Sequence, residues 1–192
     1  MNSYLQDSVY INWRTPQILS KASELRGDLN NKTLIAKACF NFVRDEIKHS
    51  WDYELNPVTC KASDVLEHGT GFCYAKSHLL AALLRANDIP AGLCYQRLTI
   101  DQDNPSYCLH GLNALFLETH GWYRVDARGN KTGVEAQFNP PIETLAYPIL
   151  EAGERDLPEV WAEPLPIVVQ SLASYKTYID MANNLPDIQV TK

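Results

Sequence analysis

The sequence lacks the long apolar runs, the basic clusters and the paired cysteines that mark several large classes of protein. Its longest apolar stretches, such as HLLAALL, fall far short of the roughly 20 residues needed to cross a bilayer. The 17 Lys and Arg residues form no run, and the formal charge of -6 argues against binding to nucleic acid. The first residues, MNSYLQDSVYINW, lack the basic and apolar regions of a secretory signal. We therefore expect a cytoplasmic protein with no membrane or nucleic-acid partner.

Cysteine is present, but not in the pattern of a disulfide framework or a structural zinc site. The five residues are an odd number at irregular spacing, without a C-x-x-C pair, and they are Cys39, Cys60, Cys73, Cys94 and Cys108. Such a set is typical of reduced thiols. Cys39 and Cys94 fall within apolar patterns, so we expect them in the core, whereas Cys60 lies in a predicted loop. We find no sequence feature of a cofactor site and expect no cofactor and no metal.

The composition is that of an ordinary globular protein. Of the 192 residues, 45% are hydrophobic and 21% are charged, which is enough apolar surface for one core. The sequence has no repeat, no low-complexity tract and no internal linker. We therefore predict one domain over residues 1-192.

Apolar residues recur with a helical period in several segments. Pro16 suits a first helical turn, the Ser63 hydroxyl can cap a helix, and Gly69 suits a helix end. Pro90 cannot continue a helix. The predicted helices cover residues 15–25, 31–49 and 63–68, the segment from the GTG turn to Pro90, and residues 167–183.

Three consecutive segments, AGLCYQRLTI, HGLNALFLE and GWYRVDA, instead have the composition of strands. The turn-forming stretches DQDNPS and THG separate them, so we predict an antiparallel sheet. One face of HGLNALFL is wholly apolar and the other mostly so, which predicts a sheet covered on both faces. Helices followed by a run of strands indicate the α+β class.

Cys73 stands where a glycine-rich turn enters an apolar helix. The N-terminus of a helix stabilises a thiolate, which is the attacking form of cysteine, but a lone cysteine there is more often core filling. His110 heads a strand after a turn and is a credible base. Asp126 ends the next strand, where an antiparallel neighbour would place it beside His110. A surface or core role is the ordinary alternative for each residue alone.

Taken jointly, these motifs resemble the transglutaminase-like superfamily of papain-type thiol enzymes. The resemblance lies in FVRDEIKHSWDYE, GTGFCYAKSHLLAALLRANDIPA and HGLNALFLETHGWYRVDARGN, and it covers about residues 41–130. It implies a papain-like, transglutaminase-core fold in which the cysteine helix packs on an antiparallel sheet. It also implies that Cys73 is the nucleophile, His110 the general base and Asp126 the acid that orients the histidine.

The sequence departs from the family pattern near the implied site. Leu112 replaces an aromatic residue, Gly92 replaces an arginine, and ARGN follows the aspartate in place of proline and threonine. One expected oxyanion donor is the backbone N–H of Cys73. The second is either the indole of Trp51 or the amide of Asn56.

Other residues near these motifs have two readings. Cys108 either forms a reversible disulfide with Cys73 on oxidation or has no role. A metal site made by Cys73, Cys108, His110 and Asp126 is a further, less economical reading. Four aromatic residues either line a substrate groove or pack in the core, and they are Trp51, Tyr53, Trp122 and Tyr123.

The resemblance implies thiol-dependent acyl transfer on the amide bonds of a peptide or protein. The family pattern includes cysteine proteases and deamidases, which are hydrolases, and transglutaminases, which transfer an acyl group to an amine. The short chain favours hydrolysis. A catalytically silent papain-like module that binds peptides is the main alternative. An arylamine acetyltransferase uses a similar triad, but the chain is short for one and has no coenzyme A feature.

Overall fold

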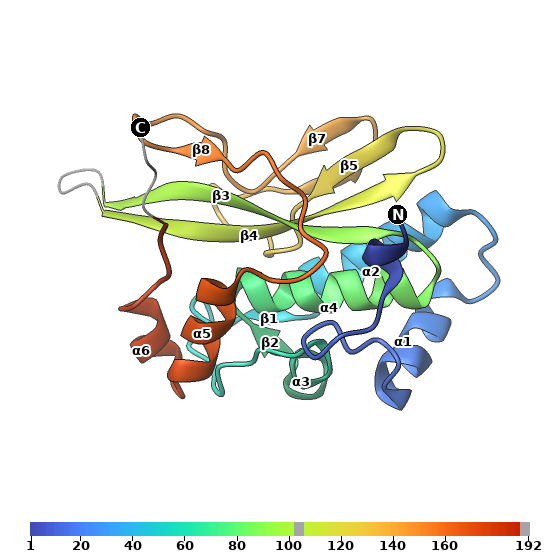
Figure 1. The fold of residues 1–192 in the computed structure, drawn as a ribbon, viewed down its shortest axis with the longest axis horizontal. Coiled ribbons are helices and arrows are strands. Elements are labelled where there is room, and N and C mark those ends of the chain that lie inside the picture. Colours follow the sequence, from blue (N-terminus) through green and yellow to red (C-terminus); the bar gives the residue numbers. More distant parts are fainter. Residues whose placement is uncertain (102–105, 189–192) are drawn as a thin grey trace.

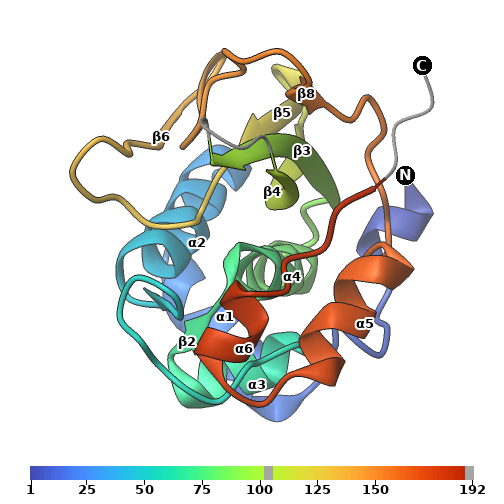
Figure 2. The same cartoon turned by 90° about the vertical axis from the view of Figure 1, so that its left-hand side faces the viewer.

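Helix α4 lies at the centre of the molecule, between an antiparallel sheet and a group of other helices (Figures 1 and 2). The computed structural model describes residues 1–101 and 106–188. The helices are η1 (Asn2–Leu5), α1 (Pro16–Arg26), α2 (Lys32–Asp45), α3 (Ala62–His68), α4 (Cys73–Ala86), α5 (Pro166–Ser174) and α6 (Tyr178–Ala182). The strands are β1 (Lys48–His49), β2 (Thr70–Gly71), β3 (Ala91–Asp101), β4 (Ser106–Leu117), β5 (Gly121–Val125), β6 (Gln137–Asn139), β7 (Ile142–Thr144) and β8 (Arg155–Asp156). This arrangement confirms the predicted α+β, papain-like core.

Helix α4 is buried on all sides, so its polar side chains need partners inside the protein. Every residue from Cys73 to Arg85 is buried. The Arg85 guanidinium donates to the carbonyl oxygens of Gln6, Ala91 and Ala162, which ties the end of α4 to three separate segments. Buried polar groups in α4 therefore hold the chain together around it.

The main sheet has the strand order β5-β4-β3-β8, and all its pairs are antiparallel. Helix α4 packs against β3 and β4 on one face. On the other face the buried side chains of Cys94, Leu112 and Ala114 pack with Leu145 and Val160. The prediction that both faces are covered is therefore correct, and Cys94 lies in the core as expected.

Strand β4 approaches the first turn of α4 so closely that any residue larger than glycine at position 111 would be crowded by the Tyr74 backbone. A Cβ atom at Gly111 would lie 3.0 Å from the Tyr74 Cα and 3.2 Å from the Tyr74 backbone nitrogen. The Tyr74 hydroxyl also donates to the Leu109 carbonyl oxygen of β4. The strand backbone and the start of the helix are therefore in direct contact.

Most predicted helices are present, with different ends. Helix α2 stops at Asp45 rather than at residue 49, because the chain turns there into β1. Helix α3 begins at Ala62 with Lys61 as its N-cap, so Ser63 lies inside the helix and does not cap it. Gly69 ends α3 in the left-handed conformation, as predicted.

The predicted C-terminal helix over residues 167–183 is wrong. The chain forms α5 and α6 instead, because Tyr175 is extended and the Thr177 side chain accepts a hydrogen bond from the Asp180 N–H to cap a new helix. Apolar periodicity continues through this break, which is why the pattern alone did not reveal it.

Several short strands were not predicted. They are the β1–β2 pair, the β6–β7 pair and the edge strand β8. The predicted turn DQDNPS falls largely on residues 102–105, which lie outside the described residues.

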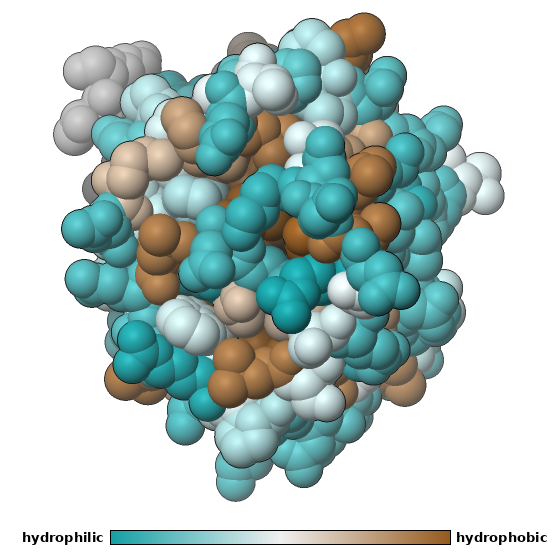
Figure 3. Space-filling view, turned by 90° about the vertical axis from the view of Figure 1, so that its right-hand side faces the viewer, coloured by the Kyte–Doolittle hydropathy of each residue, from teal (hydrophilic) through white to brown (hydrophobic). Residues whose placement is uncertain are grey.

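No helix in the described part of the chain is long and apolar enough to cross a membrane. The face at the C-terminal end of α4 is largely hydrophilic, with separate hydrophobic patches (Figure 3).

Substitution of Gly111 by alanine should destabilise the protein and disturb the start of α4. The added methyl group must displace backbone atoms of Tyr74, so we expect a loss of about 1–3 kcal/mol in the free energy of unfolding. Urea denaturation measures this loss, and alkylation of Cys73 reports the local change. Gly121→Ala is the control, since an added Cβ there has no neighbour within 4 Å and only the positive φ of 76° is strained. A Gly111→Ala protein with wild-type stability and wild-type Cys73 reactivity would contradict the close approach.

Candidate active site

Cys73 is the first residue of α4 and lies in the wall of a cavity of about 580 Å³. The β1–β2 pair and the extended N-cap Phe72 lead the chain into this position. The first N–H groups of a helix have no acceptor within the helix, and they create a positive potential there. The thiol is 8% exposed, so it is nearly buried yet borders the cavity.

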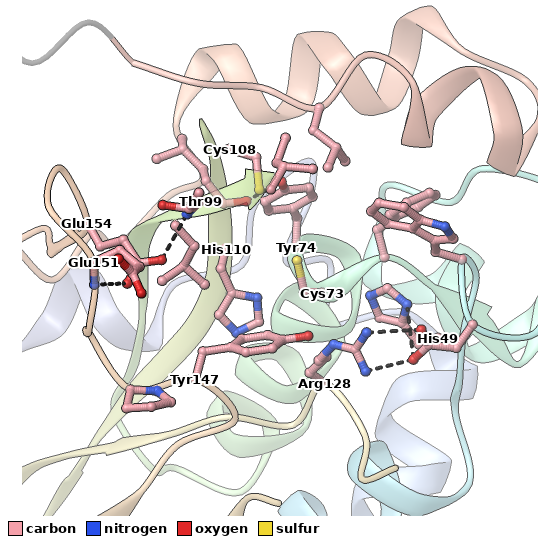
Figure 4. A pocket seen from close by; sticks show the side chains of 18 of the residues that line it. His49, Cys73, Tyr74, Thr99, Cys108, His110, Arg128, Tyr147, Glu151 and Glu154 are labelled. Carbon is pink, nitrogen blue, oxygen red and sulfur yellow. Dashed lines mark hydrogen bonds and ion pairs between the residues drawn. The ribbon is translucent and has the colours of Figure 1, made fainter. Parts of the chain in front are cut away.

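His110 of β4 reaches the same cavity and points toward Cys73 (Figure 4). Its Nε2 atom lies 2.7 Å from the Asp126 Oδ2 atom, and both side chains are buried. The pairing of β4 with β5 causes this contact, because Asn113 pairs with Val125 and the next residue, Asp126, continues toward His110. The antiparallel step expected from the sequence therefore brings the two residues together.

The buried Asp126 carboxylate is ionised by its surroundings. It accepts hydrogen bonds from the backbone N–H groups of Arg128 and Ala146, each at 3.1 Å, in addition to the His110 contact. Burial disfavours its charge, but the His110 charge and these hydrogen bonds outweigh burial and hold the pKa of Asp126 below its ordinary value. A fixed negative charge therefore lies behind the His110 ring.

The same pair favours a protonated His110. Burial opposes the imidazolium, but the negative charges of Asp126 and of a Cys73 thiolate, with hydrogen bonds to both, raise the pKa of His110 to about 10. The geometry suits a thiolate–imidazolium pair held by a carboxylate.

Backbone contacts fix the Cys73 side chain and the first turn of its helix. The Gly111 N–H donates to the Cys73 Sγ atom at 3.5 Å, and the Ser77 hydroxyl donates to the Cys73 carbonyl oxygen at 2.8 Å. A hydrogen bond to sulfur adds to the stabilisation of a thiolate.

Tyr147 forms a part of the site that the sequence analysis missed. Its ring meets the His110 ring edge-on, with centroids 5.0 Å apart and an interplanar angle of 90°. Burial raises the pKa of Tyr147 to about 12, so its hydroxyl keeps its proton. Tyr147 lies in the stretch FNPPIETLAYPI, outside the motifs of the family resemblance, and no sequence signal connects it to His110.

A second missed group is the ion cluster around Asp52. The Arg128 Nη1 and Nη2 atoms lie 2.6 and 3.0 Å from the two Asp52 oxygens, and the Lys131 Nζ atom lies 2.7 Å from one of them. Burial opposes ionisation, but these two cations lower the pKa of Asp52 to about 2. Arg128 belongs to the stretch ARGN, which departs from the family pattern. That departure was the one sequence feature that could have pointed to this ion cluster.

The structure separates the two candidates for the second oxyanion donor. Trp51 lines the cavity and is 42% exposed. Asn56 does not line it, and its side-chain oxygen instead accepts the Tyr178 N–H at 2.7 Å. Cys108 also lines the cavity, and its thiol is free.

The other candidate aromatic residues do not line this cavity. Tyr53 borders a neighbouring, smaller cavity. Trp122 packs against Tyr4 and Phe116, and the Tyr123 hydroxyl binds backbone groups of β6 and β7. Trp122 and Tyr123 therefore have a packing role, whereas Tyr53 is 55% exposed.

The alternative of a metal site is not supported in the described part of the chain. Among these described residues, no group of three or more His, Cys, Asp or Glu side chains is placed to hold a metal ion. The set of Cys73, Cys108, His110 and Asp126 is therefore not such a group. The buried Cys39 lies in the core as expected, and Cys60 is half-buried.

Comparison with known proteins points to one family. The family model of the transglutaminase-like superfamily matches residues 20–127, which is more than half of the chain and contains Cys73, His110 and Asp126. A search of curated proteins gave no significant match.

The solved structures that are similar to this chain include two bacterial proteins. A candidate cysteine protease from Cytophaga hutchinsonii is 20% identical, with a TM-score of 0.50 over 65% of this chain and 40% of that chain. The periplasmic domain of TgpA from Pseudomonas aeruginosa is 23% identical, with a TM-score of 0.49 over 65% of this chain and 45% of that chain. The aligned part therefore spans less than half of either relative, and the first likeness shows the fold.

Iodoacetamide should label Cys73 faster than the other cysteines at about pH 6. A free thiol is almost fully protonated at that pH, whereas an imidazolium at His110 favours a Cys73 thiolate. Cys60 is the comparison within the same protein, because burial raises its pKa to about 11. Peptide mass spectrometry after short labelling measures both rates. His110→Ala should remove the difference, and equal labelling of the two cysteines in the wild type would show that Cys73 is not activated.

Proposed function

The chain belongs to the transglutaminase-like superfamily, and we propose that it is a thiol-dependent acyl-transfer enzyme acting on amide bonds. In this proposal Cys73 is the nucleophile, His110 the general base and Asp126 the residue that orients the imidazole. The observation that carries it is the buried His110–Asp126 contact of 2.7 Å beside the cysteine at the start of α4.

Acylation begins with the Cys73 thiolate attacking the carbonyl carbon of the substrate. The C–N bond then breaks, and the His110 imidazolium gives its proton to the leaving amine. The acyl group stays on sulfur as a thioester. Water or a primary amine next attacks that thioester and gives a proton to His110, which restores the thiolate–imidazolium pair.

Asp126 acts through His110 in this scheme. Its hydrogen bond to Nε2 leaves the other ring nitrogen, Nδ1, for the exchange of protons near Cys73. Tyr147 packs edge-on to the same ring and limits its rotation. The imidazole is therefore held in one orientation by a carboxylate and an aromatic ring.

We propose a peptide or a protein as the substrate. Exposed apolar side chains lie around the cavity, including Trp51 at 42%, Ile100 at 47% and Leu150 at 77% exposure. Such side chains suit contact with the apolar side chains of a polypeptide. Both hydrolysis and transfer to an amine are compatible with this cavity.

Product analysis separates these two reactions. The protein is incubated with a mixture of peptides, with and without a primary amine, and the products are identified by mass spectrometry. A cleaved peptide with a new carboxylate indicates a protease, and a side-chain amide converted to an acid indicates a deamidase. A peptide that has gained the added amine indicates a transferase. Binding of peptides without turnover, unchanged by Cys73→Ala, would favour the silent module instead.

The three proposed residues should differ in the size of their effects on kcat. Cys73→Ala should reduce turnover to background, and His110→Ala should reduce it by about 10³-fold or more, because the two act as one unit. Asp126→Ala should leave more residual activity, since it makes and breaks no bond. Steady-state kinetics measure these effects.

The melting temperature of each variant is the control. Asp126 also accepts two backbone N–H groups, so its variant is expected to lose stability, whereas the loss of activity in Cys73→Ala should occur at nearly wild-type stability. Wild-type kcat in Cys73→Ala would refute the proposed function.

A further inference from the structure

His49 lies beside the nucleophile through a backbone pairing that connects distant parts of the sequence. Strand β1 pairs in parallel with β2, and His49 is opposite Gly71, two residues before Cys73. The His49 side chain is 6% exposed and lines the same cavity as Cys73 and His110. Its ring also packs edge-on against Phe72, with centroids 5.7 Å apart. Secondary structure therefore fixes its position relative to Cys73.

One nitrogen of the His49 ring, Nδ1, has no hydrogen-bond partner among the described residues. The Nδ1 atom is buried and unpaired among the described residues. The nearest carboxylate oxygen, Asp52 Oδ2, is 3.7 Å away, which is too long for a hydrogen bond. Asp52 is already bound to Arg128 and Lys131.

This environment favours one protonation state of the imidazole. Burial and the positive charge of Arg128 keep the pKa of His49 well below its ordinary value, and the charge of Asp52 does not compensate. The neutral ring carries one proton. Of its two neutral tautomers, only the one protonated on Nε2 can donate a hydrogen bond on the side of the ring away from Asp52. The Nδ1 atom is the ring nitrogen on the Asp52 side. The His49 side chain lines the cavity together with Cys73 and Arg128 (Figure 4).

We propose that His49 donates its Nε2–H to the oxyanion that forms when Cys73 attacks a carbonyl carbon. This inference rests on the proposed acyl transfer and names the second oxyanion donor, beside the backbone N–H of Cys73. The donor is preorganised, because β1, Phe72 and the cavity wall hold the ring before any substrate binds. His49 is thus a catalytic residue that the sequence analysis did not identify.

The structure favours His49 over the two earlier candidates. Trp51 is 42% exposed, so water competes for its indole N–H and its position is less restricted. Asn56 lies away from the cavity and is bound to Tyr178. A buried neutral donor stabilises a developing negative charge more strongly than an exposed one.

Two reactions of the same thiol test the proposal. Alkylation by iodoacetamide replaces iodide at a saturated carbon and forms no oxyanion, whereas acylation by p-nitrophenyl acetate passes through one. His49→Leu should therefore slow acylation by about 100-fold or more and change alkylation of Cys73 by less than about threefold. Release of p-nitrophenol measures acylation, and mass spectrometry measures alkylation.

Two conservative variants test which nitrogen donates. Glutamine places its amide N–H near the position of Nε2, and asparagine places it near Nδ1. His49→Gln should retain most of the acylation rate, and His49→Asn should resemble His49→Leu. This comparison is between two polar variants, so it remains informative even where His49→Leu disturbs folding. The melting temperatures of His49→Gln and His49→Asn check that the two variants are equally stable.

Several outcomes would overturn the inference. Equal losses of alkylation and acylation in His49→Leu would indicate a structural role. An unchanged acylation rate in His49→Leu, with a loss of about 100-fold in Trp51→Phe, would assign the donor to Trp51. A wild-type protein that is alkylated at Cys73 but neither acylated by the ester nor active on peptides would refute the proposed function itself, which the His49 variants alone cannot do.

Discussion

The contact between the backbone of β4 and the first turn of α4 determines the geometry of the whole site. Gly111 allows this contact, since any side chain there would meet the Tyr74 backbone. The neighbouring His110 is thereby placed beside Cys73, and the Gly111 N–H reaches the sulfur.

Two buried histidines border this contact, and their surroundings favour different protonation states, a cation at His110 and a neutral ring at His49. Burial opposes the imidazolium in both. At His110 the charge of Asp126 outweighs burial and raises the pKa to about 10, whereas at His49 the cation Arg128 adds to burial and Asp52 does not compensate. One ring therefore suits proton transfer and the other suits donation of a hydrogen bond without ionisation. Burial acts in the same direction on both rings, so the difference comes from the sign of the charge that acts most strongly on each one.

The sequence predicted the parts of the structure that depend on local patterns and on the order of motifs. The glycine cap at Gly69, the apolar helix after it and the alternating strands are local, and the family resemblance correctly indicated the core fold. Positions Cys73, His110 and Asp126 followed from motif order, and the structure brings them together, although their roles remain proposals. The break between α5 and α6 was missed because the apolar pattern continues through it.

The missed parts of the site depend on contacts between distant segments. His49 reaches the cavity through the parallel β1–β2 pair, and Tyr147 reaches His110 from a segment beyond residue 127, where the family match ends. Arg128 also follows that boundary, and its positive charge adds to burial in lowering the pKa of His49. The proposed nucleophile, base and carboxylate thus lie within the matched region, whereas Tyr147 and Arg128, which contact or influence the two histidines, lie beyond it. For this reason the shared motifs define the chemistry of the cavity more closely than they define its walls.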